Sequence, residues 1–210
     1  MSIKATYTTE KNLDKAIAEI AGAIASGIAP KVVIYFASSA FEPEALAAGM
    51  QKAFPSSATL GCSTAGEIAS GCMLDHAIVA MRLDGNVVED VAIAMLGDIR
   101  ADARSAVEDA FASFQARTGQ SMAQLDPSKF VGIILADGLA GAEEGLMDRI
   151  GDLTNITFIG GSAGDDLKFQ QTYVHANGKA YSGAAVLALV KPRNGFEILT
   201  KRVILSLEFM

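Results

Sequence analysis

Two short loops carry most of the reactive side chains that stand close together in this 210-residue chain. The first is "GCSTAGEI" at residues 61–68, and the second is "GGSAGDD" at residues 160–166. Their hydroxyls, together with backbone N–H groups exposed by glycine, can donate hydrogen bonds to a carboxylate. Glu67, Asp165 and Asp166 can accept from a cationic group. The loops therefore favour a small zwitterion, such as an amino acid, over a phosphate, which the acids would repel.

Each loop follows a predicted strand–helix–strand unit. In the first unit, "KVVIYFA" from Lys31 and "ATLG" at 58–61 are short apolar strands, and "EPEALAAGMQKAF" between them has Pro43 in the first turn of a helix. The same order returns from Lys129 as "KFVGIILA", "AEEGLMDRI" and "ITFIGG". A right-handed crossover makes the two strands of each unit parallel. Ligands of α/β proteins bind beyond the carboxyl ends of such strands, where both loops are expected.

The two units form an internal repeat. An ungapped shift of 98 residues aligns Lys31 with Lys129 and places Thr64-Ala65-Gly66-Glu67 on Ser162-Ala163-Gly164-Asp165. We therefore expect one domain over residues 1–210, built of two similar halves at about 10–98 and 101–200. A pseudo-twofold relation would bring the loops to the same end of the molecule, facing each other across one cleft.

The remaining elements complete a mixed α/β fold. Helices are predicted after the N-cap Asn12 and over residues 102–117, and hairpins are predicted at "DGN" (84–86), with Gly85 at positive φ, and at Asn177–Gly178. Runs such as "AIVAM" and "AAVLALV" are apolar at successive positions, as in strands covered on both faces. Mixed parallel and antiparallel sheets in an αββα sandwich are predicted. One continuous sheet flanked by helices is the alternative.

The predicted ligand-binding residues come from the two loops and from the end of the strand that starts at Lys129. Asp137, which follows that strand and corresponds to Ser39 at the shift of 98, is expected to line the same cleft. The alternative without a ligand is that the loops only turn the chain, with Asp165 capping its own turn. The full set is Gly61, Ser63, Thr64, Gly66, Glu67, Asp137, Gly161, Ser162, Gly164, Asp165 and Asp166.

The sequence contains few signs of an enzyme active site or a metal site. Residues 160–164 match G-x-S-x-G, but the chain after Ser162 is polar and then strand-like, whereas a nucleophile elbow needs a helix there. A serine hydrolase is the less favoured alternative, and no enzyme is predicted. Cys62, Cys72 and His76 match no zinc spacing, and no metal site is predicted. His175 and His76 are the only imidazoles that could bind a haem iron.

Composition restricts partners and location. The net charge is -7 and the basic residues are scattered, which argues against nucleic acid. The N-terminus lacks a secretory signal, and the longest apolar run, 184–190, is too short to span a bilayer. Two cysteines are too few for a disulfide framework. We therefore expect a soluble cytoplasmic protein with no membrane partner.

The motifs "LGCSTAGEI", "ADG" at 136–138, "IGGSAGDD" and "SGAAVLALV" resemble the N-terminal domain of the FIST family of bacterial sensory proteins, from about residue 10 to 200. The resemblance implies an intracellular signal-transduction domain that binds a small molecule such as an amino acid. It also implies signalling partners such as histidine kinases, chemoreceptors and cyclic-dinucleotide enzymes.

Some proteins of the family resemble haem-based nitric oxide sensors that regulate a histidine kinase, so haem is the alternative ligand. Family members usually continue into a C-terminal module. This chain ends after Thr200 with "KRVILSLEFM" and is expected to lack that module.

Overall fold

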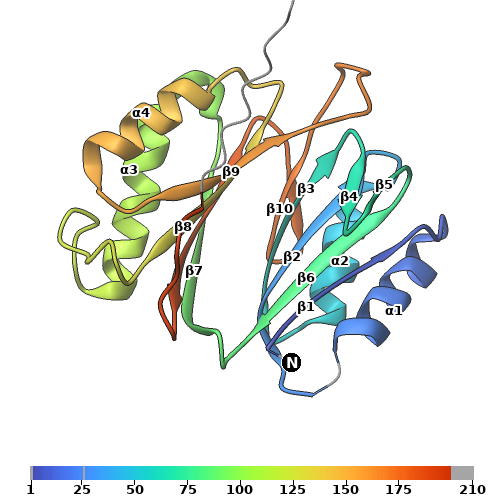
Figure 1. The fold of residues 1–210 in the computed structure, drawn as a ribbon. Helices are drawn as coiled ribbons and strands as arrows, with labels where there is room; N and C mark the ends of the chain where they lie inside the picture. Colours follow the sequence, from blue (N-terminus) through green and yellow to red (C-terminus); the bar gives the residue numbers. More distant parts are fainter. Residues whose placement is uncertain (1, 26, 200–210) are drawn as a thin grey trace, which may run out of the picture.

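The computed structural model describes residues 2–25 and 27–199. The stretch 201–210, on which the expected lack of a C-terminal module was based, lies outside the described residues. Within the described part, two sheets pack face to face and a pair of helices covers the outer face of each (Figure 1). The prediction of a mixed α/β fold arranged as an αββα sandwich is confirmed. Among the described helices, none has both the length and the apolar character needed to cross a bilayer.

The elements divide between the two sheets as follows. The first sheet has the order β1 (Ile3–Thr8), β6 (Ile78–Asp84), β2 (Pro30–Ser38), β3 (Ala58–Thr64), β10 (Val174–Ala176), β11 (Lys179–Tyr181). The second has the order β7 (Val88–Leu96), β12 (Ala185–Pro192), β8 (Val131–Asp137), β9 (Phe158–Ala163). A separate hairpin consists of β4 (Glu67–Ala69) and β5 (Cys72–Leu74), and the helices are α1 (Leu13–Ile24), α2 (Pro43–Ala53), α3 (Ile99–Thr118) and α4 (Glu143–Leu153).

Three apolar clusters hold the layers together. One lies between α1, α2 and the first sheet around Tyr35, and another lies between α3, α4 and the second sheet around Phe114. The third fills the space between the sheets and includes Ile34, Leu60 and Val186. Strands in both sheets therefore bury both faces, which explains their continuous apolar runs.

The two sheets share one strand order. The series β1-β6-β2-β3 has the same pairing directions as β7-β12-β8-β9, with only the β2–β3 and β8–β9 pairs parallel. Both parallel pairs also have the same register, because Val32 pairs with Ala58 and Gly132 pairs with Phe158. This is the pseudo-twofold relation expected from the sequence.

The predicted hairpin at "DGN" is wrong. β6 pairs with β1 and β2, whereas β7 pairs with β12, so the chain crosses from one sheet to the other between residues 84 and 88. Gly85 lacks positive φ, and the turn is held by the Asn86 N–H donating to Asp84 Oδ1 at 2.9 Å. The sheets thus divide earlier in the chain than the boundary expected at 98–101.

The second predicted hairpin is confirmed, but its position is unexpected. β10 and β11 pair across Asn177 (φ 46°) and Gly178 (φ 83°), values typical of a tight two-residue turn. β10 then pairs with β3 in the first sheet, although it follows β9 of the second sheet in the chain. The outer edge of β3 is therefore covered, and in Figure 1 β10 lies beside β3.

Candidate functional site

The structure brings the two loops into direct contact. The Gly164 N–H donates to the Ser63 carbonyl at 2.9 Å, and Ser63 Oγ donates to the Gly164 carbonyl at 2.8 Å. A Cβ added at Gly164 would lie 3.0 Å from the Ala65 nitrogen. The loops thus meet at one end of the molecule, as the pseudo-twofold relation predicts, but they touch each other at this point.

The alignment of the repeats at a shift of 98 is wrong by one residue. Ser38 Oγ accepts from the N–H of Ala40, and Asp137 Oδ1 accepts from the N–H of Leu139, so Ser38 and Asp137 are equivalent. Ser63 then corresponds to Ser162. A slip of one residue moves a strand side chain to the opposite face, which is why Ser39 and Thr64 were the wrong partners. The shared Lys31 and Lys129 misled the alignment, whereas the inward-facing alternation of each strand would have corrected it.

Glu67 is buried, and its carboxylate is bonded to donors within the protein. Its carboxylate accepts from Thr64 Oγ1 at 2.5 Å and from the Ala77 N–H at 2.9 Å, and the residue is 1% exposed. Gly66, immediately before it, has φ of 133°, a conformation that side-chain-bearing residues avoid. Glu67 therefore fixes the path of the chain into β4.

The acids of the second loop also bind within the protein. Asp165 accepts from the backbone N–H groups of Gln170 at 2.7 Å, Phe169 at 3.0 Å and Gln171 at 3.2 Å. The Gln170 N–H is the main cause that lowers the pKa of the Asp165 carboxyl. Asp166 accepts from Ser39 Oγ at 2.6 Å. Asp165 thus caps its own turn, the arrangement expected if the loop only turns the chain.

Asp137 ties the end of β8 to the segments that surround β10 and β11. It is 1% exposed and accepts from Leu139, Thr172, Ser182 and Gly183. Burial opposes ionisation, but these donors outweigh it and hold the pKa of Asp137 below its ordinary value. Like Glu67 and Asp165, this carboxylate stabilises the loops from within.

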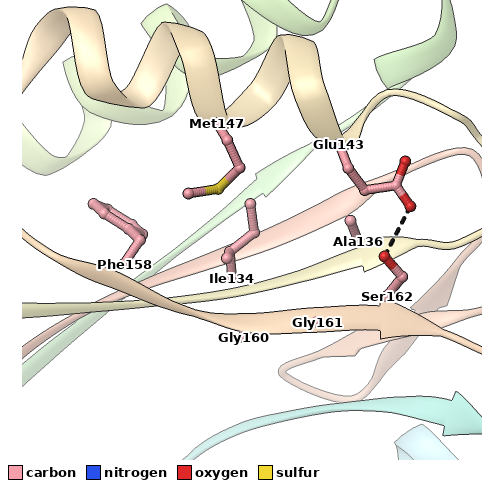
Figure 2. Close-up of a pocket in the computed structure, with 8 residues that line it drawn as sticks. All are labelled: Ile134, Ala136, Glu143, Met147, Phe158, Gly160, Gly161 and Ser162. Carbon is pink, nitrogen blue, oxygen red and sulfur yellow. Dashed lines mark hydrogen bonds between the residues drawn. The ribbon is translucent and has the colours of Figure 1, made fainter. Parts of the chain in front are cut away.

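Two cavities lie on either side of β9. Figure 2 shows the first, here called the α4 cavity, with a volume of about 300 Å³ between α4 and the outer face of the second sheet. The second, the inter-sheet cavity, has about 380 Å³. The α4 cavity is lined by Ile134, Ala136, Glu143, Met147, Phe158, Gly160, Gly161 and Ser162. The inter-sheet cavity is lined by Ile34, Phe36, Cys62, Thr64, Met81, Ile133, Leu135, Ile159, Gly160, Gly161 and Ser162.

The glycine pair of β9 forms the wall between the cavities. A Cβ at Gly160 would lie 1.7 Å from the Ile134 carbonyl oxygen, so only glycine fits there. A Cβ at Gly161 would meet no atom within 4 Å. Because Ile159 lines the inter-sheet cavity and Ala163 lies in the inter-sheet core, strand alternation points position 161 into that cavity. Gly161 thus leaves the space open.

Ser162 lacks the surroundings of a nucleophile. Its Oγ donates to Glu143 Oε1 at 2.8 Å (Figure 2), and it lies within strand β9 with no strand-to-helix turn. Neither histidine lines the α4 or inter-sheet cavity. The elbow geometry that the G-x-S-x-G pattern would require is therefore missing around this serine.

The histidines do not fit a haem group. His175 is 1% exposed and stacks on Tyr35 with ring centroids 5.4 Å apart, beside a cavity of only about 40 Å³. That volume is close to one water molecule and far below a porphyrin. Burial lowers the pKa of His175 to about 4. His76 packs edge-on against Phe41 and lines none of these three cavities.

Sequence reasoning identified part of the cavity lining and missed the rest. Thr64, Gly161 and Ser162 line the cavities, and Ser63 lines the small one beside His175. The apolar residues that give the cavities their character were missed, because in sequence they look like ordinary core residues. The signal that could have indicated the cavities is "FIGG" in β9. Its two glycines have no side chains to fill the space on either face of a covered sheet.

The fold and the cavities define a two-sheet α/β domain with an internal repeat and space for a small ligand. The model of the FIST N domain matches residues 31–201, and the chain belongs to this family of signal-transduction sensory domains. A search of curated proteins finds no significant match.

Proposed function

We propose that this FIST N domain senses a small molecule that places an apolar group in the inter-sheet cavity. The observation that carries the proposal is the cavity itself, with about 380 Å³ beside the contact between the two loops. Ligand pockets commonly begin at about 300 Å³ and are mostly apolar with a few polar groups. This cavity has that character, because aliphatic and aromatic side chains surround the hydroxyl of Thr64 and the backbone of Gly161 and Ser162.

An amino acid with an apolar side chain is one candidate ligand. Its side chain suits the cavity, but the acids first expected to bind the ammonium group are occupied by protein donors. The ammonium and carboxylate groups would therefore bind the exposed backbone of β9. Ligand-binding roles are retained for Thr64, Gly161 and Ser162, whereas Glu67, Asp137 and Asp165 hold the loops in place.

Occupancy of the cavity provides a physical basis for signalling. The cavity is bounded by strands of both sheets, and the sheets are joined nearby through Ser63 and Gly164. A ligand that binds only one relative placement of the sheets shifts the population toward it. A histidine kinase or another signalling protein could read such a shift, and the identity of this partner stays a prediction.

The test is thermal unfolding of the purified protein with a panel of amino acids, fatty acids and small aromatic compounds. A ligand raises the melting temperature when it binds the native state. In Gly161→Leu, the new side chain fills the cavity and should abolish the shift, whereas Gly97→Leu, at an exposed position with open space, should keep it. Equal shifts in both variants would place the ligand elsewhere, and the absence of any shift would contradict the proposal.

A further inference from the structure

Strand β9 has one edge that no other described strand covers, unlike its counterpart in the first sheet. Among the described residues β9 pairs with β8 alone, and Gly160, Gly161 and Ser162 are exposed. Its counterpart β3 is buried, because β10 pairs along its outer edge. Figure 1 shows β9 at the margin of its sheet. The pseudo-symmetric molecule thus has one completed strand edge and one open strand edge at equivalent places.

The backbone groups available on this edge can be assigned from the register. The Gly132 N–H donates to the Thr157 carbonyl, and alternate residues of a parallel strand point toward the partner. Residues 157, 159, 161 and 163 therefore face β8, and Phe158, Gly160 and Ser162 direct their N–H and C=O groups outward. The next outward N–H, that of Gly164, is already bonded to Ser63. An open stretch of edge thus runs from residue 158 to residue 162.

Charge distinguishes β9 from the other sheet edges. β1 carries Lys4, β11 is a three-residue strand with Lys179, and β7 carries Glu89 and Asp90. Charges and short strands protect sheet edges from pairing with other chains. β9, with the sequence "FIGGSA", has no charged residue. This edge therefore lacks the protection given to the other three.

We propose that β9 binds a peptide ligand in extended conformation, which adds to the second sheet as its next strand. Side chains of an added strand alternate between the two faces of the sheet. One set would enter the inter-sheet cavity, and the other would enter the α4 cavity, where Met147 and Phe158 are apolar and Glu143 is acidic. The matching peptide has apolar residues toward the sheet interior and a basic residue opposite Glu143.

A second copy of this chain suits the edge less well. An antiparallel β9–β9 pair would place both copies of α4 on the same face of the joined sheet. That face carries Glu143, Glu144 and Asp148 of each copy, and each chain has a net charge of -7. Like charges brought together disfavour the pair, whereas a basic peptide relieves them.

The first experiment uses acetylated pentapeptide amides of the form Thr-Φ-X-Φ-Thr, with Leu, Val or Phe at Φ and Lys, Arg, Ser or Glu at X. Binding is measured by calorimetry. The inference rests on the proposed function, because Φ enters the same inter-sheet cavity. We expect Lys or Arg at X to bind at least tenfold more tightly than Glu.

Each binding peptide is then N-methylated at alternate residues, in both phases. Strand addition requires that one phase abolish binding and the other be tolerated.

The second experiment compares Ser162→Pro with Ser162→Ala, which both lack the hydroxyl and differ in the outward backbone N–H. Proline is tolerated where a strand N–H faces away from its partner, so both variants should fold. Binding at least tenfold weaker in Ser162→Pro supports the inference. Equal effects of the two methylation phases would overturn strand addition and leave the cavity proposal intact. The same conclusion would follow if amino acids or apolar compounds stabilised the protein but no peptide bound. If nothing binds, both proposals fail.

Discussion

Ser63 and Gly164 are 101 positions apart in the chain and exchange two hydrogen bonds at 2.8 and 2.9 Å. Ser63 Oγ also accepts from the Tyr173 N–H at 3.0 Å, so one buried serine joins the first loop, the second loop and the segment that leads to β10. The two halves of the molecule are therefore connected close to Thr64 and Ser162, which line the inter-sheet cavity.

This contact makes the loop glycines sensitive to substitution. Gly164→Val should lower the free energy of unfolding by about 1 to 3 kcal/mol, because the new Cβ would press on Ala65, and Gly66→Val should do the same through its positive φ. Urea unfolding measures both. Gly97→Val is the control, because a Cβ at this exposed position would meet no atom within 4 Å. Similar losses at positions 97 and 164 would mean that the loop contact is loose.

Asp137 should stabilise the protein in a pH-dependent way. Its folded-state pKa lies below the unfolded value, so its contribution is present above about pH 4 and is lost as pH falls through the folded pKa. Asp137→Asn should therefore cost about 1 to 3 kcal/mol at pH 7 and less at pH 3. Asp109→Asn, on the exposed side of α3, should have little effect at either pH. Urea unfolding at the two pH values that gives an unchanged difference would contradict this role.

His175 should act in the same pH direction but in a higher window. Burial lowers its pKa from 6.5 to about 4, so the unfolded chain binds the proton more readily between these values. Stability should fall by up to about 3 kcal/mol as pH drops through this window. His175→Phe should remove that component, which is seen by comparing unfolding curves at pH 7 and pH 4.5. Parallel losses in both proteins would assign the effect to other groups.

Ser162 should have no hydrolytic role. A screen of esters, amides and phosphoesters is expected to show no turnover that depends on Ser162, because its hydroxyl donates to a carboxylate and has no imidazole base. Ser162→Ala serves as the comparison. Turnover by the natural protein that disappears in this variant would establish an enzyme in place of a binding module.

The sequence predicted most elements of the sandwich because they have local causes, but it missed β1 and the β4–β5 hairpin. Asn12 caps α1 through its Oδ1 and the Lys15 N–H, Pro43 begins α2, and Asn177–Gly178 turns β10 into β11. It did not predict which strands share a sheet. The "DGN" turn has the same local chemistry in a hairpin as in a crossover, and only the long-range pairing of β7 with β12 decides between them.

The meeting of the two loops was predicted from the repeat, and the contact between Ser63 and Gly164 agrees with it. The ligand-binding role of their glycines and hydroxyls stays a prediction. The acids look like ligand groups in sequence, yet Asp165 finds three donors in its own turn and Asp137 finds donors more than thirty residues away. Whether a carboxylate is free depends on the folded surroundings, which residue spacing does not report.

The placement of β10 and β11 has a consequence for how the chain can be divided. They lie between β9 and β12 in sequence, but they complete the sheet formed by the first half. Fragments produced by a cut at residue 85 would each be incomplete: the first would expose the edge of β3, and the second would carry a hairpin without its partner strand. Mixed together, such fragments should reassemble as complementing pieces, and in the intact chain neither half should melt without the other.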